Sequence, residues 1–335
     1  MGEQDGQARR RPTLEDVAQR AGVSRAMVSI VLRGVAGSRP ETRQRVLKAA
    51  EEIGYRPDTR ARLLASGGSR QLGVAFGTSG RFQAELLDGL YVAAKETGYE
   101  LILSALTPSR DERIAVETLL DFRCEAMILL GLGHLGVPVL AGRLPLTVIG
   151  WRVADSSVDV VRTSDEQGMR YAVDHLVELG HRAIAHVDGG PGPVAAARRQ
   201  AYRASMRRHG LGAEIRVVRG GQSIDVGVRS TRPLLEAPTR PTAVICYNDE
   251  VAAGLLEALA SAGVEVPRDM SIVGWDDSSL ARLPHLSLTT VRQDAIEMTR
   301  LALDRSIARL RDEPVARREV VLSPELIVRD STAAP

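Results

Sequence analysis

The chain has 335 residues, of which 44% are hydrophobic, a length that suits two or three domains with buried cores. The formal net charge is only +2, yet the first 70 residues hold 14 Lys and Arg against 8 Asp and Glu, whereas the remainder holds 30 against 34. The N-terminus has no apolar signal segment, no later stretch approaches the ~18 apolar residues of a membrane span, and Cys124 and Cys246 form no C-x-x-C pair, so we expect a cytoplasmic protein that is neither secreted nor membrane-bound.

Residues 12–57 have the pattern of a small helical domain that follows a flexible tail at residues 1–11. Thr13 is a typical helix-capping residue, and apolar residues recur after it at helical spacing. The residues on this apolar face are Leu14, Val17, Ala18 and Ala21. Gly22 then permits a sharp turn, and Ser24 can cap a second helix. Two short helices joined in this way form a helix-turn-helix.

The second helix has two contrasting faces. Val28, Val31 and Leu32 would point inward against the first helix. The opposite face presents Arg25, Ala26, Ser29, Ile30 and Arg33. A third helix over residues 41–53 would complete the core. An exposed face of Arg and Ser on a basic domain predicts a recognition helix for double-stranded DNA, and the alternative is a three-helix bundle that makes protein contacts.

Small residues and glycines at positions 65–70 mark the boundary between this head and a body of residues 71–330. Within the body, short β-branched runs alternate with amphipathic helical patterns, which predicts βαβ units, parallel sheets and an α/β fold. A body of about 260 residues is long for one doubly wound domain, so we expect two subdomains. We expect an N-subdomain at residues 71–162 and 292–321, and a C-subdomain at residues 163–289 and 322–330.

Polar residues of the body are placed for ligand binding and not for catalysis. Asn248 and Asp276 follow the carboxyl ends of two expected strands, where open α/β sheets bind ligands. Arg198 belongs to a helix after a glycine-rich loop. Together these residues offer hydrogen-bond donors and acceptors without a nucleophile–base pair, which suits recognition of hydroxyl groups. The six histidines form no metal-spaced cluster and no G-x-S-x-G elbow occurs, so we expect no enzyme activity, no metal and no cofactor.

Several motifs make a family resemblance specific. The head contains T-L-x-D-V-A-x-x-A-G-V-S-x-x-x-V-S-x-V-L from Thr13, followed by G-Y-x-P-D at residues 54–58. The body contains L-G-H-R-x-I-A, R-P-T-A-V-I-C-Y-N-D-E-V-A-x-G, V-P-R-D-M-S-I-V-G-W-D-D and L-S-L-T-T-V-R-Q, which end at residues 185, 254, 277 and 293. From Thr13 to about Asp330 the chain resembles the lactose-repressor (LacI/GalR) family. The resemblance implies a helix-turn-helix head and a body like the periplasmic sugar-binding proteins.

For the head, the resemblance implies particular DNA contacts. Arg25 and Ala26 match positions that face major-groove bases, and Thr13, Ser24 and Ser29 match positions that contact phosphates. Residues 58–70 would form the hinge, with a helix at residues 60–65 and Leu64 as a wedge in the minor groove. The chain departs from the usual family residues at Met27, Ile30, Arg33 and Asp58. Ile30 can contact only a thymine methyl group, so the preferred bases stay open.

For the body, the resemblance implies an effector pocket. Phe82, Trp151 and Asp165 match further pocket positions, and Phe82 and Trp275 would pack against a ligand face. The alternatives are that Asp165 and Asp276 cap a helix or turn and that Trp275 belongs to the core. We expect a homodimeric repressor on operator DNA, controlled by a small polar effector that is a sugar or sugar derivative. The alternatives are a regulator that answers to a nucleobase or other metabolite, and a solute-binding receptor.

Overall fold

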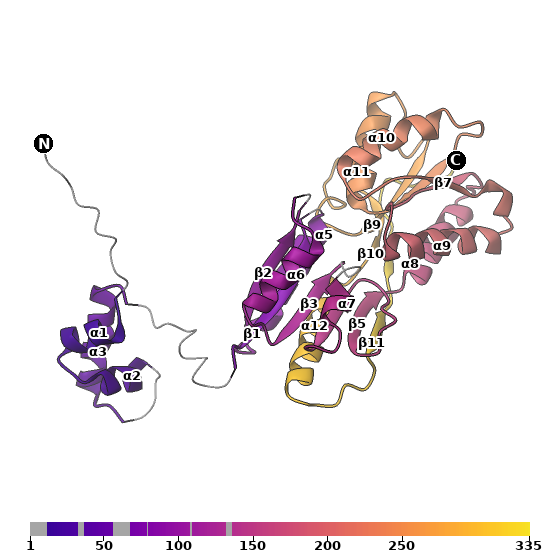
Figure 1. Cartoon of the computed structure of the whole chain (residues 1–335). Coiled ribbons are helices and arrows are strands. Elements are labelled where there is room, and N and C mark those ends of the chain that lie inside the picture. Colours follow the sequence, from indigo (N-terminus) through magenta and orange to yellow (C-terminus); the bar gives the residue numbers. More distant parts are fainter. Residues whose placement is uncertain (1–11, 33–36, 56–67, 79, 108, 132–135) are drawn as a thin grey trace, which may run out of the picture. The chain divides into compact units, whose positions relative to one another are not determined.

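The computed structural model describes residues 12–32, 37–55, 68–78, 80–107, 109–131 and 136–335. The chain divides into two compact units, Met1–Ser69 and Arg70–Pro335, which we call the head and the effector domain (Figure 1). The predicted contacts of Arg33 and Leu64, the tail at residues 1–11 and most of the expected hinge lie outside the described residues.

The head is built from α1 (Leu14–Ala21), α2 (Arg25–Leu32) and α3 (Pro40–Glu52). Thr13 and Asp16 form a capping box at the start of α1, and Gly22 ends that helix in the left-handed conformation, with φ of 63°. The three helices pack around a small apolar core that includes Val17, Val28 and Val46. The predicted helix-turn-helix with a supporting third helix is therefore present.

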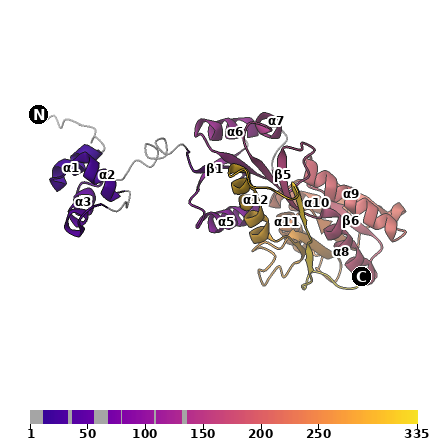
Figure 2. The same ribbon diagram turned by 90° about the horizontal axis from the view of Figure 1, so that it is seen from below.

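The first half of the effector domain is a six-stranded sheet in the order β11-β5-β4-β3-β1-β2, and all of its pairings are parallel. We call this sheet with its helices the N-subdomain. Its strands are β1 (Gln71–Gly77), β2 (Glu100–Leu106), β3 (Ala126–Leu130), β4 (Leu146–Ile149), β5 (Val158–Thr163) and β11 (Glu319–Leu322), and its helices are α5 (Arg81–Ala94), α6 (Glu112–Asp121), α7 (Gly136–Leu140) and α12 (Ala295–Leu310). Every residue of β3 is buried because α5 and α12 cover one face of the sheet and α6 and α7 the other (Figure 2).

The second half, which we call the C-subdomain, is a six-stranded sheet in the order β12-β10-β9-β8-β6-β7. Only the pairing of β10 with β12 is antiparallel. Its strands are β6 (Ile184–Val187), β7 (Arg216–Val218), β8 (Ala243–Cys246), β9 (Ser271–Asp276), β10 (Thr289–Arg292) and β12 (Glu325–Ile327), and its helices are α8 (Asp165–Glu178), α9 (Pro193–Arg208), α10 (Ile224–Leu235) and α11 (Asp249–Ser261), with a short 3₁₀ turn at Gly212–Glu214. The pair α8 and α9 covers one face, and the pair α10 and α11 covers the other.

The chain passes from one sheet to the other between β5 and α8, between β10 and α12, and between β11 and β12. Parallel sheets with helices on both faces confirm the predicted α/β class. Because the strands of each sheet end on one edge, the two subdomains can present loops to a shared cleft.

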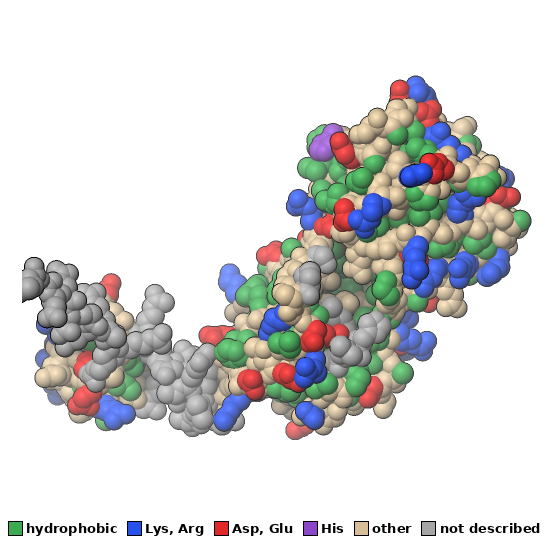
Figure 3. Space-filling model, turned by 45° about the horizontal axis from the view of Figure 1, so that its top comes forward, with side chains coloured by type: hydrophobic (Ala, Val, Ile, Leu, Met, Phe, Trp, Pro, Cys, Tyr) green, Lys and Arg blue, Asp and Glu red, His purple; other side chains and the backbone are tan. Residues whose placement is uncertain are grey.

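The surface of the effector domain carries basic and acidic side chains that are interspersed on the face shown in Figure 3. Among the described helices, none is both long and apolar enough to cross a membrane. Cys124 and Cys246 are buried free thiols. Burial raises the pKa of Cys124 to about 11 and also raises that of Cys246, so neither thiol is activated for chemistry.

Candidate DNA-reading helix and effector cleft

The helix α2 presents the face that the sequence predicts for DNA. Arg25 and Ala26 are exposed, whereas Val28 and Val31 are buried against the other helices of the head. Ser29 and Ile30 are half-buried at the margin of this face. The first turn of α2 therefore carries the side chains that are most accessible to a groove, as in recognition helices that read bases with their N-terminal residues.

Two of the predicted phosphate-contacting residues also hold the helices in place. The hydroxyl of Ser24 accepts the backbone N–H of Met27 at 3.2 Å, and the hydroxyl of Thr13 accepts that of Asp16 at 3.4 Å. A hydroxyl that accepts such a bond can still donate its own hydrogen. The hydroxyl of Thr13 does so to Asp16 at 2.8 Å, and this bond competes with a phosphate contact.

A cleft between the two subdomains brings several polar side chains together. The empty space in this cleft is about 570 Å³ when the part open to solvent is included. The N-subdomain contributes Gly80, Phe82, Gln83, Leu86, Gly131, Ile149 and Gly150. Val194, Arg198, Gln222, Tyr247, Asn248, Asp276 and Gln293 line it from the C-subdomain and from the end of β10. Four of the seven predicted ligand-binding residues, Phe82, Arg198, Asn248 and Asp276, therefore line one cleft.

Arg198 is fixed by contacts on several sides. It projects from the first turns of α9, and its residue surface is only 4% exposed. Its Nε donates to Oδ1 of Asp165 at 3.0 Å, and its Nη1 donates to the backbone oxygen of Tyr247 at 2.6 Å. Burial works to lower the pKa of Arg198, but the charge of Asp165 outweighs it and the pKa is raised. The cleft thus contains a fixed cation.

Three predicted pocket residues are not among those that line the cleft. Asp165 is the first residue of α8 and lies behind Arg198, so it positions that side chain. Trp275 is fully buried, and its ring centroid lies 4.2 Å from the guanidinium carbon of Arg198. Trp151 packs against the hydrophobic cluster of the N-subdomain that includes residues of α6 and α7. Trp275 therefore belongs to the core, which is the alternative that the sequence left open, because its side chain packs against α8 and α9.

Asn248 and Asp276 occupy the carboxyl ends of β8 and β9. Asn248 caps α11 by accepting the N–H of Val251 at 2.9 Å, and its Nδ2 donates to the backbone oxygen of Gln222 at 2.9 Å. Oδ1 of Asp276 accepts from Nε2 of Gln293 at 2.7 Å. Burial raises the pKa of Asp276 well above its ordinary value, although Arg198 acts in the opposite direction. A buried carboxyl group of this kind gains from any further hydrogen-bond donor that a ligand brings.

The residues that line the cleft are suited to binding a ligand and not to catalysing a reaction. Its polar groups are amides, a carboxyl group and a guanidinium, and no nucleophile–base pair is found among the residues that line it. The buried His186 lies near this region, but its Nδ1 faces the backbone oxygen of Ile245 at 2.9 Å and burial lowers its pKa to about 4. Within the described part of the chain, no group of His, Cys, Asp and Glu could hold a metal ion.

Known proteins resemble this chain over almost its whole length. Residues 13–58 match the model of bacterial regulatory proteins of the lacI family, and residues 173–332 match the periplasmic binding protein-like domain. The HTH-type transcriptional regulator AscG of Escherichia coli (strain K12) is 32% identical over 96% of this chain and 99% of its own. The chain belongs to the lacI family. It is therefore a DNA-binding transcriptional regulator and not an enzyme.

Solved structures of the lacI family agree with the fold. The lac repressor dimer bound to operator and the anti-inducer ONPF has a TM-score of 0.84 and 27% identity, over 97% of this chain and 100% of that one. A complex of the transcriptional regulator CelR with cellobiose has a TM-score of 0.71 and 29% identity, over 96% and 100% of the two chains. The predicted family and the predicted fold class are confirmed.

Four polar residues that line the effector cleft were not predicted from the sequence, namely Gln83, Gln222, Tyr247 and Gln293. Gln83 is notable because its buried Oε1 has no hydrogen-bond partner among the described residues. A signal was present for three of them, since Gln83 follows Phe82, Tyr247 precedes Asn248, and Gln293 ends a family motif. Gln222 lies in an irregular segment, and no sequence pattern pointed to it.

Proposed function

We propose that this regulator is a homodimeric repressor whose DNA affinity is controlled by a sugar or sugar derivative bound in the cleft. The observation that carries the proposal is the cleft itself, in which Gln83, Arg198, Asn248, Asp276 and Gln293 converge from both subdomains on one cavity. A ligand that bonds to both sides stabilises one arrangement of the subdomains, which is how a small molecule changes a distant property of a protein.

The polar lining favours a sugar over a nucleobase. Neither predicted tryptophan is among the residues that line the cleft, so Phe82 and Tyr247 are the aromatic residues left to cover a ligand face. Amide and carboxyl groups predominate, and these bond to the paired donors and acceptors that hydroxyl groups offer. The similar regulator CelR was solved as a complex with cellobiose, which is a sugar.

On the DNA side, we assign reading of the operator to the face of α2 that carries Arg25, Ala26, Ser29 and Ile30. Within the head we assign phosphate contacts to Thr13, Ser24 and Ser29, and we assign the hinge to residues 58–70. In a homodimer the two heads would read half-sites ~34–36 Å apart on a near-palindromic duplex. Because such a regulator acts where the chromosome is, we also assign it to the cytoplasm.

The experiment is a paired measurement on the full chain. A thermal-shift screen would compare glucose, ribose and cellobiose with adenine, guanine and hypoxanthine, and a compound at 100 times its dissociation constant adds about 2.7 kcal/mol of stability. Selection from random duplexes would then be carried out with and without the compound that scores. Stabilisation by a sugar that also changes DNA affinity supports the proposal. Stabilisation by a purine alone would show that the effector is a nucleobase and not a sugar. Absence of any preferred duplex would contradict the assignment of DNA binding.

A further inference from the structure

Two carboxylates connect the N-subdomain and the C-subdomain in opposite directions. Oε1 of Glu85, on α5 of the N-subdomain, accepts the backbone N–H of Ser279 at 3.1 Å, in the segment that follows β9 of the C-subdomain. Oε1 of Glu250, on α11 of the C-subdomain, accepts the backbone N–H of Arg81 at 2.9 Å, at the start of α5. Each subdomain therefore supplies an acceptor to a backbone donor of the other.

The Glu250 contact satisfies a group that α5 cannot satisfy by itself. Helix α5 begins after Gly80, which has no side chain and makes no capping hydrogen bond. The first N–H groups of a helix need an outside acceptor, and a carboxylate there also interacts favourably with the helix dipole. Glu250 is thus a helix cap supplied by the opposite subdomain, and it acts only when the two subdomains are this close.

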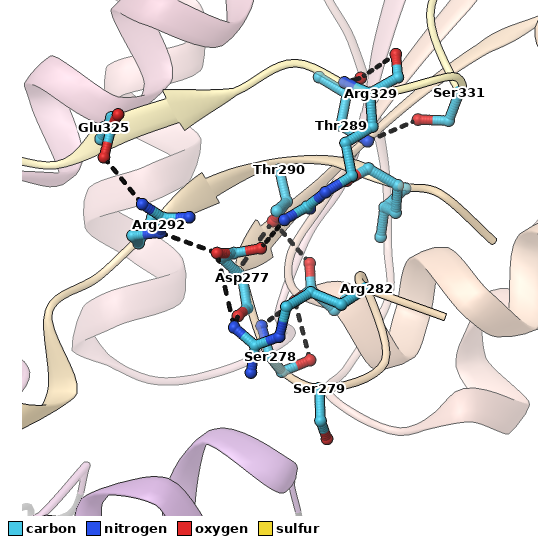
Figure 4. Close-up of polar contacts among 12 residues, drawn as sticks. Asp277, Ser278, Ser279, Arg282, Thr289, Thr290, Arg292, Glu325, Arg329 and Ser331 are labelled. Atoms are coloured by element: carbon cyan, nitrogen blue, oxygen red, sulfur yellow. Dashed lines mark hydrogen bonds and ion pairs between the residues drawn. The ribbon is translucent and has the colours of Figure 1, made fainter. Parts of the chain in front are cut away.

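The Glu85 contact is connected through Arg282 and Asp277 to Asp276, the carboxyl group that we assign to effector binding. Arg282 lies beside Glu85, with its Nη2 3.8 Å from Oε1, and its Nη1 donates to the backbone oxygen of Asp277 at 3.0 Å. Asp277 is 3% exposed and immediately follows Asp276. Figure 4 shows its carboxylate between arginine side chains, with Nε of Arg292 at 2.8 Å and Nη2 of Arg329 at 2.6 Å.

The turn that contains these residues is held in an unusual shape. Asp276 has a φ of 111° and Asp277 a φ of 52°, values that residues other than glycine rarely adopt. Such a backbone persists when its surroundings over-determine it. Asp277 is held by Arg292 and Arg329, and the N–H of Ser278 donates to Oδ2 of Asp249 at 2.7 Å. These contacts join Asp276 to Ser279 through consecutive residues of one turn, and Arg282 bonds to the same turn at Asp277.

We propose that Glu85 and Glu250 form a reciprocal clasp that holds the effector cleft closed, and that Asp277 and Arg282 connect this clasp to Asp276. Glu85 and Glu250 are positioning residues, since they act on the arrangement of the subdomains and do not line the cleft. The inference rests on the proposed function in one respect, namely that Asp276 binds the effector. The clasp sets the fraction of closed cleft before any effector arrives, and so the apparent effector affinity.

The test is site-resolved hydrogen–deuterium exchange on the full-length protein without effector or DNA. Glu250→Ala removes the acceptor of the Arg81 amide, and we expect that amide to exchange about tenfold faster, the scale of one lost charge-assisted hydrogen bond. The clasp also predicts faster exchange at the Ser279 amide, which Glu250 does not touch, because the cleft opens. Glu85→Ala should likewise speed exchange at Arg81 as well as at Ser279.

A matched control is Glu257→Ala, an exposed glutamate two turns along α11 from Glu250. This variant should leave both amides unchanged. Arg282→Gln, at a side chain that is 54% exposed, should speed exchange at Ser279 more than at Arg81, because Arg282 supports only the Glu85 half of the clasp. Circular dichroism melts of all the variants separate cleft opening from general unfolding.

If each alanine variant changes only the amide that it contacts, or neither amide, the clasp is overturned and the contacts are local. If general unfolding accounts for the faster exchange, the clasp is overturned as well. The measurement uses no effector and no DNA. The clasp can therefore fail while the regulator still binds its ligand, and it can hold in a protein for which the sugar screen finds nothing.

Discussion

The guanidinium carbon of Arg198 lies 4.2 Å from the ring centroid of the fully buried Trp275, so the indole forms a floor beneath the cation that lines the effector cleft. A desolvated cation–π pair of this kind contributes about 2 kcal/mol. The tryptophan thereby affects a ligand through the arginine it supports. Substitutions that displace the indole and substitutions of Asp165 should therefore both alter the position of Arg198 in the cleft.

Gly168 of α8 sets the space available to that indole. A Cβ at this position would come within 2.6 Å of Cη2 of Trp275. We expect Gly168→Ala to destabilise the protein by about 1–3 kcal/mol because the indole or the helix must shift in a packed core. Urea unfolding would measure this loss. Gly212→Ala is the control, since its nearest contact is an ordinary 3.7 Å to Arg207, and its midpoint should stay near that of the parent protein.

Asp165→Ala tests the charge that holds Arg198. Removing one partner of a buried ion pair leaves the other charge uncompensated, which costs about 3–5 kcal/mol. The neighbouring Glu166 is the control, because its ion pair with Arg162 is exposed at the carboxylate and contributes at most about 1 kcal/mol. Chemical denaturation of Asp165→Ala and Glu166→Ala compares the two. Equal, small losses would show that the Asp165 contact does not matter to Arg198.

Asp276 should make stability depend on pH in a direction opposite to that of a salt-bridged aspartate. Burial raises the pKa of Asp276 in the folded state, and burial also raises the pKa of the nearby Asp249 to about 6. Between the unfolded pKa near 3.9 and the raised folded values, the folded chain binds more protons than the unfolded one, so this contribution falls as pH rises.

The variant Asp276→Asn removes one of these titrating groups. We expect the stability difference between Asp276→Asn and the parent protein to grow in favour of the variant from pH 4 to pH 7, measured by urea unfolding at each pH. The same variant should lose stabilisation by any effector found in the screen. A difference that stays flat over this range would mean that Asp276 titrates normally.

Arg25→Ala separates base reading from phosphate binding. A bidentate contact with guanine contributes about 1–3 kcal/mol of discrimination at one base pair. We therefore expect the variant to relax preference at one position of the selected duplex and at its symmetric partner. Competition binding against all single-base variants of that duplex measures this. Equally weaker binding to every sequence would assign Arg25 to the phosphate backbone.

Much of the site could be placed from local pattern. The caps at Thr13 and Ser24 and the apolar spacing between them predict the helix-turn-helix, because these signals act within a few residues. Asn248 and Asp276 could be assigned to one cleft since each follows a buried strand, and the carboxyl ends of parallel strands meet at one edge. The family resemblance added Phe82, whose position near the start of α5 has no local signal of its own.

The sequence by itself determined the helical head, the alternation of strands and helices, and the strand ends that bear polar residues, because hydrophobic period and capping are properties of short segments. The tertiary structure alone decided that Trp275 lies beneath Arg198, since adjacent strand residues point to opposite faces and only packing shows which face is covered. It alone placed Asp165, at the start of α8, against Arg198 of α9, because only packing brings these two helices together. It also decided the contact of Arg81 with Glu250, which are 169 residues apart, because no local rule relates groups that meet only when two sheets come together.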